Sequence, residues 1–193
     1  MMNLNRLSEE VHANAVKHGF WEGNPSTEHC LMLVVTEIAE MVEADRKGNV
    51  AVINHIRKQR NLAAAQKCRM VDDVDRHPDF NVAFTEMVKD TVEDEMADVV
   101  IRLLDLSGAL GIDFDKMCPN KYHRAFDRFS FAENAFALTK GLCRENINIF
   151  KRVQFGIHYC GLWAKNQGIN LEWHVRAKMR FNASRPVKHG KKY

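Results

Sequence analysis

Residues 93–104 read Glu93-Asp94-Glu95-Met96-Ala97-Asp98-Val99-Val100-Ile101-Arg102-Leu103-Leu104. Apolar residues recur in this stretch at intervals of three and four, which is the spacing of a buried helical face. The pattern extends in both directions and predicts one long helix from about Phe80 to Leu110, which Gly111 ends. Glu95 and Asp98 are three residues apart, so on this helix they project from nearly the same face.

A second stretch, Glu37-Ile38-Ala39-Glu40, has the same spacing between two acids. It lies on a predicted helix from about Glu28 to Arg46, whose start Ser26 or Thr27 caps and which Lys47-Gly48-Asn49 ends. Apolar residues surround both acidic pairs, so the acids border the buried side of their helices. The alternative interpretation is ordinary charge on a solvated helix face.

Four carboxylates that border one core repel one another strongly unless a cation lies between them. Mg²⁺ suits oxygen ligands and phosphate substrates, and Mn²⁺ can substitute for it. We therefore predict that Glu37, Glu40, Glu95 and Asp98 meet around a divalent metal ion.

The composition favours an all-α protein. The 193 residues suit one domain, or one domain with an internal duplication, and they include only four Pro and ten Gly. Alternating β-branched runs are scarce, which favours helices over a sheet. Helices are also predicted over residues 8–19, 50–66, 132–142, 147–166 and 171–182, with Ser8 capping the first and a charged loop over 71–79.

The charge and the cysteines exclude some classes of protein. The net charge of +3 is mild and its excess lies in residues 176–193, which favours contact with a phosphate over binding to duplex nucleic acid. Five Cys without a CxxC pair are typical of a reduced, cytoplasmic protein. The sequence has no secretory signal pattern and no apolar run long enough to span a membrane. It also lacks the P-loop and HExxH motifs.

The two acidic motifs resemble the signature of the MazG-like all-α nucleoside triphosphate pyrophosphohydrolases, a superfamily that includes the dimeric dUTPases. That signature is similar to E-E-x-x-E followed by E-x-x-D, which here reads Thr36-Glu37-Ile38-Ala39-Glu40 and then Glu95-Met96-Ala97-Asp98. Thr36 replaces the first Glu of the pattern. Residues of about 4–48, 80–113 and 170–193 carry the resemblance, including the stretches 89–106 and 178–193.

The resemblance implies an antiparallel helical bundle of the MazG-like type. Its catalytic helical core would span residues 1–113, with an insertion at about 49–79, and a helical extension would span 114–193. It implies hydrolysis of a nucleoside or deoxynucleoside triphosphate between the α and β phosphates, which gives a monophosphate and pyrophosphate. The four acids would hold the metal, and Glu37 or Glu40 would hold or deprotonate the attacking water. A homodimer or higher homo-oligomer is expected.

The substrate contacts are predicted from the end of the chain and from one loop. Lys178, Asn182 and Arg185 share one helical face at i, i+4 and i+7, where Lys and Arg suit phosphate and Asn suits a sugar or base. Lys188 and His189 follow on the tail, and a solvated basic terminus is the alternative. Trp21 stacks on the base, or else the Phe20-Trp21 loop packs the first helix on the second.

Several alternatives stay open. Arg102 pairs with Asp98 or with Asp105. The stretch Gly111–Asp115 resembles Gly168–Glu172 at an offset of 57, which places Arg152 opposite Glu95 and is compatible with a degenerate second repeat. The other functions considered are a non-catalytic helical protein that binds a nucleotide or a partner, and a dUTPase-like specialist.

Overall fold

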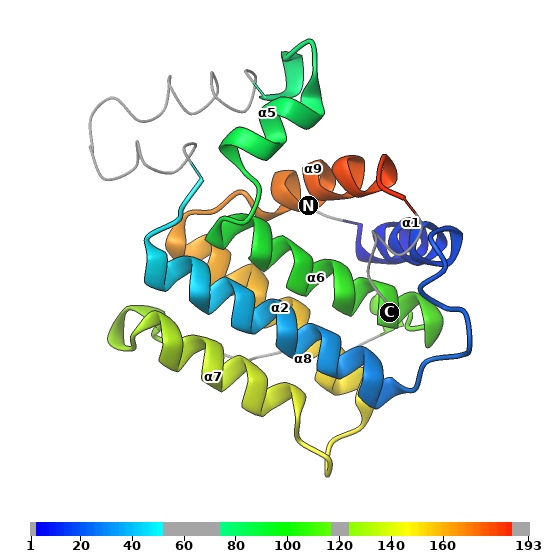
Figure 1. Ribbon diagram of the computed structural model, residues 1–193. Helices are drawn as coiled ribbons and strands as arrows, with labels where there is room; N and C mark the ends of the chain where they lie inside the picture. Colours follow the sequence, from blue (N-terminus) through cyan, green and yellow to red (C-terminus); the bar gives the residue numbers. More distant parts are fainter. Residues whose placement is uncertain (1–2, 52–73, 117–123, 187–193) are drawn as a thin grey trace.

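Helix α6 (Val92–Ala109) lies at the centre of the molecule and contacts four other helices, α1, α2, α8 and α9 (Figure 1). Nearly every residue from Val92 to Leu106 is buried, so this helix has no broad solvated face. The computed structural model describes residues 3–51, 74–116 and 124–186, and every regular element within these ranges is helical. The prediction of an all-α protein is confirmed.

Four helices form an antiparallel bundle. Helix α2 (Thr27–Lys47) packs on α6 and on α7 (Phe131–Leu142), and α8 (Ile149–Gln167) packs on the same two helices from the other side. The colours in Figure 1 show that neighbouring helices in this ring run in opposite directions. Large side chains fill the centre, among them Met41, Met96, Leu103, Leu138 and Trp163.

Two further helices pack on α6 outside the bundle. Helix α1 (Leu4–Lys17) approaches it closely at Gly108, where an added Cβ would lie 2.5 Å from His12 Cβ. The Ser8 hydroxyl donates a hydrogen bond to the Leu104 carbonyl at 3.0 Å across the same contact. The sequence prediction that Ser8 caps the helix is wrong, because α1 begins one turn earlier with Asn3 as its N-cap.

Helix α9 (Leu171–Ala183) is held from two sides. It packs on α6, and it also packs on α5 (Phe80–Met87), where the Phe181 ring stacks on Phe84 with centroids 4.6 Å apart. Arg180 adds a cation–π contact above the Phe80 ring. This small second core fixes the rotation of α9 and therefore the direction of its polar residues.

The predicted long helix over residues 80–110 is interrupted. Helix α5 ends at Met87 and α6 begins at Val92, with Asp90 between them in the left-handed region at φ 60°. Thr91 caps α6 because its side chain accepts a hydrogen bond from the Asp94 amide. Because the apolar periodicity continues through residues 88–91, the sequence pattern did not reveal the break.

Other predicted elements agree with the structure. Helix α2 begins after the N-cap Ser26 and ends at Gly48, whose φ of 67° a glycine adopts without strain. The three C-terminal helices lie within two residues of their predicted bounds. The link between α6 and α7 contains two short 3-10 helices, η2 (Phe114–Lys116) and η3 (Phe126–Arg128). Most of the predicted helix 50–66 lies outside the described residues.

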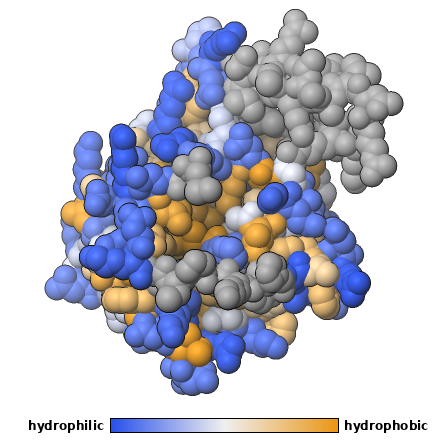
Figure 2. Space-filling model, turned by 180° about the vertical axis from the view of Figure 1, so that it is seen from behind, coloured by the Kyte–Doolittle hydropathy of each residue, from blue (hydrophilic) through white to orange (hydrophobic). Residues whose placement is uncertain are grey.

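Seen from behind, hydrophobic side chains gather near the middle of the molecule and hydrophilic ones surround them (Figure 2). None of the helices in the described ranges combines the length and the apolar character that crossing a bilayer requires.

Candidate metal and substrate site

One cavity brings together most of the residues that the sequence analysis selected. It has a volume of about 230 Å³ and lies between α1, α2, α6 and α9. The link before α6 and the residues that follow α1 and α9 also line it. Seven of the candidate residues line it, namely Glu37, Glu40, Glu95, Asp98, Lys178, Asn182 and Arg185. The cavity therefore combines carboxylates on α2 and α6 with cations and an amide from the end of the chain.

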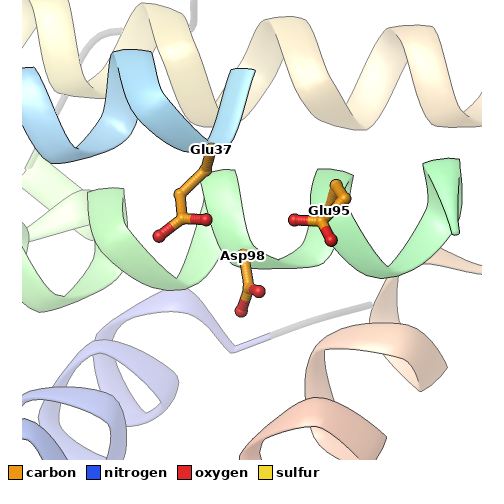
Figure 3. Close-up of side chains that lie close together, drawn as sticks. All are labelled: Glu37, Glu95 and Asp98. Atoms are coloured by element: carbon orange, nitrogen blue, oxygen red, sulfur yellow. The ribbon is translucent and has the colours of Figure 1, made fainter. Parts of the chain in front are cut away.

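Three of the four acids form a compact group. Glu37, Glu95 and Asp98 each offer one carboxylate oxygen, and these three oxygens lie within 4.8 Å of one another. Figure 3 shows Glu37 reaching from α2 toward the two acids of α6. Oxygens bound to one Mg²⁺ ion lie about 3 Å apart when adjacent and about 4 Å apart when opposite. Small side-chain movements would therefore let all three oxygens reach one ion.

Glu40 has a different position. It lines the same cavity one turn further along α2, but it is exposed and does not belong to the compact group of three acids. The predicted metal ligand set of four acids is thus represented by three close acids and one on the cavity rim.

Glu95 carries the clearest sign of a missing partner. Its side chain is 5% exposed, and Oε2 is a buried oxygen with no hydrogen-bond donor among the described residues. Burial and the negative charge of Asp98 raise the pKa of Glu95 to about 8. A buried carboxylate oxygen without a partner is costly, and a cation between the three acids would remove that cost. The donor set and this orphaned oxygen both fit a hard divalent ion.

The other two acids of the group are already paired with basic side chains. Arg102 Nε donates a hydrogen bond to Glu37 Oε1 at 3.0 Å, and Lys178 Nζ lies 2.8 Å from Asp98 Oδ2. Burial and Asp98 raise the pKa of Glu37, and Arg102 opposes that rise. Arg102 therefore pairs with an acid on the neighbouring helix, and the two partners considered from the sequence, Asp98 and Asp105, are both wrong.

A second acidic group, formed by Asp90, Asp94 and Glu95, lies next to the first. Lys89 Nζ is 2.6 Å from Asp90, and Lys178 Nζ is 2.6 Å from Asp94 Oδ2. Burial works against the charge on Lys178, but Asp98 and Asp94 together raise its pKa above the ordinary value. Lysine side chains thus neutralise two acids of this second group, which leaves Glu95 as the acid that it shares with the first.

The two aromatic residues of the loop after α1, Phe20 and Trp21, make different contacts. Phe20 lines both the cavity described above and a small neighbouring one, whereas Trp21 lines the small one. The Trp21 indole donates a hydrogen bond to Asp105 Oδ1 at 2.8 Å, and His12 Nδ1 lies 2.8 Å from the same oxygen. Burial raises the pKa of Asp105, and the His12 and Trp21 contacts oppose that rise. Trp21 therefore fastens the loop to α6, and Phe20 is the ring of this loop that lines the cavity with the acids.

Two residues of α9 that the sequence analysis placed on one helical face, Lys178 and Asn182, line the cavity together. Lys178 and Asn182 are buried on the side of α9 that faces α6, and Arg185 lies two residues beyond the helix end. Arg185 Nη1 lies 3.5 Å from Asn182 Oδ1. Lys188 and His189, which the sequence analysis placed on the basic tail, lie outside the described residues.

Sequence reasoning missed Asp94 and the pairing of Arg102 with Glu37. Asp94 had a local signal, because Thr91-x-x-Asp94 is a typical helix start.

Comparison with protein-family models, with curated proteins and with solved structures found no match to this chain.

Proposed function

We propose that this protein hydrolyses a nucleoside or deoxynucleoside triphosphate to the monophosphate and pyrophosphate with the help of a divalent metal ion, in the manner of the MazG-like enzymes. The observation that carries the proposal is the cavity itself. Three acids able to share one cation face cations and an amide suited to phosphate and sugar. A triphosphate with its metal is complementary to this arrangement, because the acids attract the metal and the cations attract the phosphates.

Mg²⁺ held by Glu37, Glu95 and Asp98 would neutralise phosphate oxygens and make a water molecule more acidic. Lys178 and Arg185 would bind the phosphate oxygens that the metal does not contact, because both cations line the same cavity. Asn182 would orient the sugar or the base through its amide. Phe20, on the cavity wall next to α1, offers a ring on which a base can stack.

Glu40 is the best-placed acceptor for the proton of the attacking water. Its carboxylate is exposed on the cavity rim, whereas Glu37 is buried and held by Arg102. A general base needs a free lone pair and access to water, and Glu40 meets both requirements more fully than Glu37. This assigns binding of the cation to Glu37 and transfer of the proton to Glu40 Oε.

The test is a panel of the eight common nucleoside triphosphates with Mg²⁺, in which monophosphate and pyrophosphate are both quantified. The expected result is equal amounts of the two products from at least one nucleotide, and loss of both in Glu95→Gln. Release of inorganic phosphate with a diphosphate would contradict cleavage between the α and β phosphates. With dUTP added, the same panel would recognise a dUTPase-like specialist by its preference for that nucleotide.

A second candidate is a protein that binds a nucleotide without hydrolysing it. One observation favours it: Arg102 and Lys178 already neutralise Glu37 and Asp98 without a metal. Calorimetry with Mg²⁺ and a non-hydrolysable deoxynucleotide separates the two functions. Binding without turnover of any nucleotide in the panel would support this candidate.

A further inference from the structure

Lys178 has two carboxylate partners that differ in how far they are exposed to the cavity. Its Nζ lies 2.6 Å from Asp94 Oδ2 and 2.8 Å from Asp98 Oδ2. The side chain of Asp94 is fully buried and does not line the cavity, whereas the side chain of Asp98 is 17% exposed and lines it. One partner of the ammonium group is thus enclosed by protein, and the other faces the place that a ligand would occupy.

The backbone holds Asp94 firmly. Its amide donates a hydrogen bond to the Thr91 side chain, and its Oδ2 accepts one from the Asp90 amide at 3.0 Å. The residue stands in the first turn of α6, where the helix dipole favours a negative charge. Moving this carboxylate would require opening the start of α6, so its place is fixed by the fold.

Binding of a divalent cation at the compact acidic group would change the charges that surround Lys178. Asp98 would then share its charge with the metal, and Lys178 would be a buried cation close to a divalent one. A buried ammonium group is stable only when a carboxylate partner remains beside it. Asp94 is that remaining partner, because it is outside the cavity and keeps its contact with Nζ.

We propose that Asp94 is a positioning residue that holds the Lys178 side chain in place at the cavity when Asp98 turns from Lys178 to a divalent cation. Asp94 itself touches neither the metal nor the substrate. The role assigned here to the phosphate-binding Lys178 rests on the proposed function, whereas the exchange of partners at Asp98 can be tested with the metal alone.

The test is a double-mutant cycle on the affinity for Mn²⁺ without nucleotide, measured by calorimetry in the wild type, Asp94→Asn, Lys178→Gln and the double variant. Asp94→Asn keeps the shape of the side chain, and Lys178→Gln keeps a donor toward residue 94. In Asp94→Asn, Asp98 is the remaining carboxylate partner of Lys178. A bound metal ion must then compete with Lys178 for Asp98. Mn²⁺ affinity should therefore fall by roughly tenfold or more.

The cycle distinguishes this role from a direct effect of the Asp94 charge on the affinity for the metal. If Asp94 acts through Lys178, Asp94→Asn weakens Mn²⁺ binding strongly when Lys178 is present and only slightly when it is combined with Lys178→Gln. An equal loss in both backgrounds would overturn the proposal. Glu93→Gln is the matched control, because Glu93 is a buried acid in the same turn that accepts its hydrogen bond from the Ala51 amide. Its Mn²⁺ affinity should stay close to that of the wild type.

A second measurement needs no change at Lys178. In protein with ¹³C-labelled lysine, the Lys178 Cε signal should keep a distinct chemical shift when Mg²⁺ is added to the wild type. In Asp94→Asn, Mg²⁺ should move it toward the shift of the exposed lysines, and an unchanged signal there would also overturn the proposal. Pyrophosphate release is independent of both tests, so a wild type without turnover would reject the enzyme while leaving the Asp94–Lys178 result intact.

Discussion

Arg102 Nε lies 3.0 Å from Glu37 Oε1, so a cation on α6 neutralises a buried acid on α2. The two residues are 65 positions apart in the sequence and join the two helices that carry the acidic motifs. The contact fixes the rotation of Glu37 toward Glu95 and Asp98. It also explains how three acids can approach one another before any metal is bound.

Arg102→Leu should destabilise the metal-free protein. The change leaves Glu37 buried without its cation, which costs roughly 3 kcal/mol of unfolding free energy. Urea unfolding at pH 7 measures the loss. The double variant Glu37→Gln with Arg102→Leu should recover most of it, because no unpaired charge remains. Equal stability of Arg102→Leu and the wild type would show that this ion pair is not needed.

The metal-free protein should lose stability as the pH rises from about 4.5 to 8. Glu95 has a pKa of about 8 in the folded chain and an ordinary value of 4.5. Between these values the unfolded chain has released the proton while the folded chain retains it, so unfolding is favoured by at most about 1.4 kcal/mol per pH unit. Below pH 4.5 both states are protonated, and this contribution to the slope disappears.

Glu95→Gln provides the control for this pH dependence. The amide does not titrate, so the variant should show a flatter stability curve between pH 4.5 and 8 in urea unfolding. Adding Mg²⁺ to the wild type should have a similar effect, because the cation stabilises the charged carboxylate. An identical slope in the wild type and the variant would remove Glu95 as its cause.

The helices could be predicted from sequence where the signals are local. Ser26 and Gly48 mark the ends of α2, and the three-residue spacing of Glu95 and Asp98 places both acids on one face. The partner of Arg102 could not be predicted, because side-chain packing between two helices selects Glu37 over acids nearer in the sequence. The break before α6 was missed because the buried stripe continues across it, although Thr91 and Asp94 signal a new start.

Gly108→Ala should push α1 away from α6. The added Cβ would lie 2.5 Å from His12 Cβ and 3.0 Å from the Ser8 carbonyl oxygen, which are both parts of the opposing helix. Overpacking of this kind costs roughly 1–3 kcal/mol. Gly161→Ala on α8 is the matched control, because nothing lies within 4 Å of its new Cβ. That change should stabilise α8 by roughly 0.5–1 kcal/mol, so the two variants should move the urea midpoint in opposite directions.

The two aromatic residues after α1 should separate substrate binding from folding. Phe20→Ala removes the ring from the cavity and should raise KM for the nucleotide severalfold. Trp21→Phe removes the donor to Asp105 and should cost roughly 1–2 kcal/mol of stability with little change in KM. Steady-state kinetics and urea unfolding of both variants test this division. A larger KM change in Trp21→Phe would place that indole at the base.

Glu37→Gln and Glu40→Gln should differ in what they lose. Glu37 belongs to the group of three acids whose oxygens lie within 4.8 Å, whereas Glu40 lies on the exposed rim of the same cavity. Removing the charge of Glu37 should weaken Mn²⁺ binding and pyrophosphate release together. Removing the proton acceptor at Glu40 should lower kcat by roughly 100-fold or more while Mn²⁺ affinity stays nearly unchanged. Because both changes are isosteric and on one helix, far-ultraviolet circular dichroism should show equal helicity. Loss of Mn²⁺ binding in both variants would instead make Glu40 a metal ligand and leave the proton to another group.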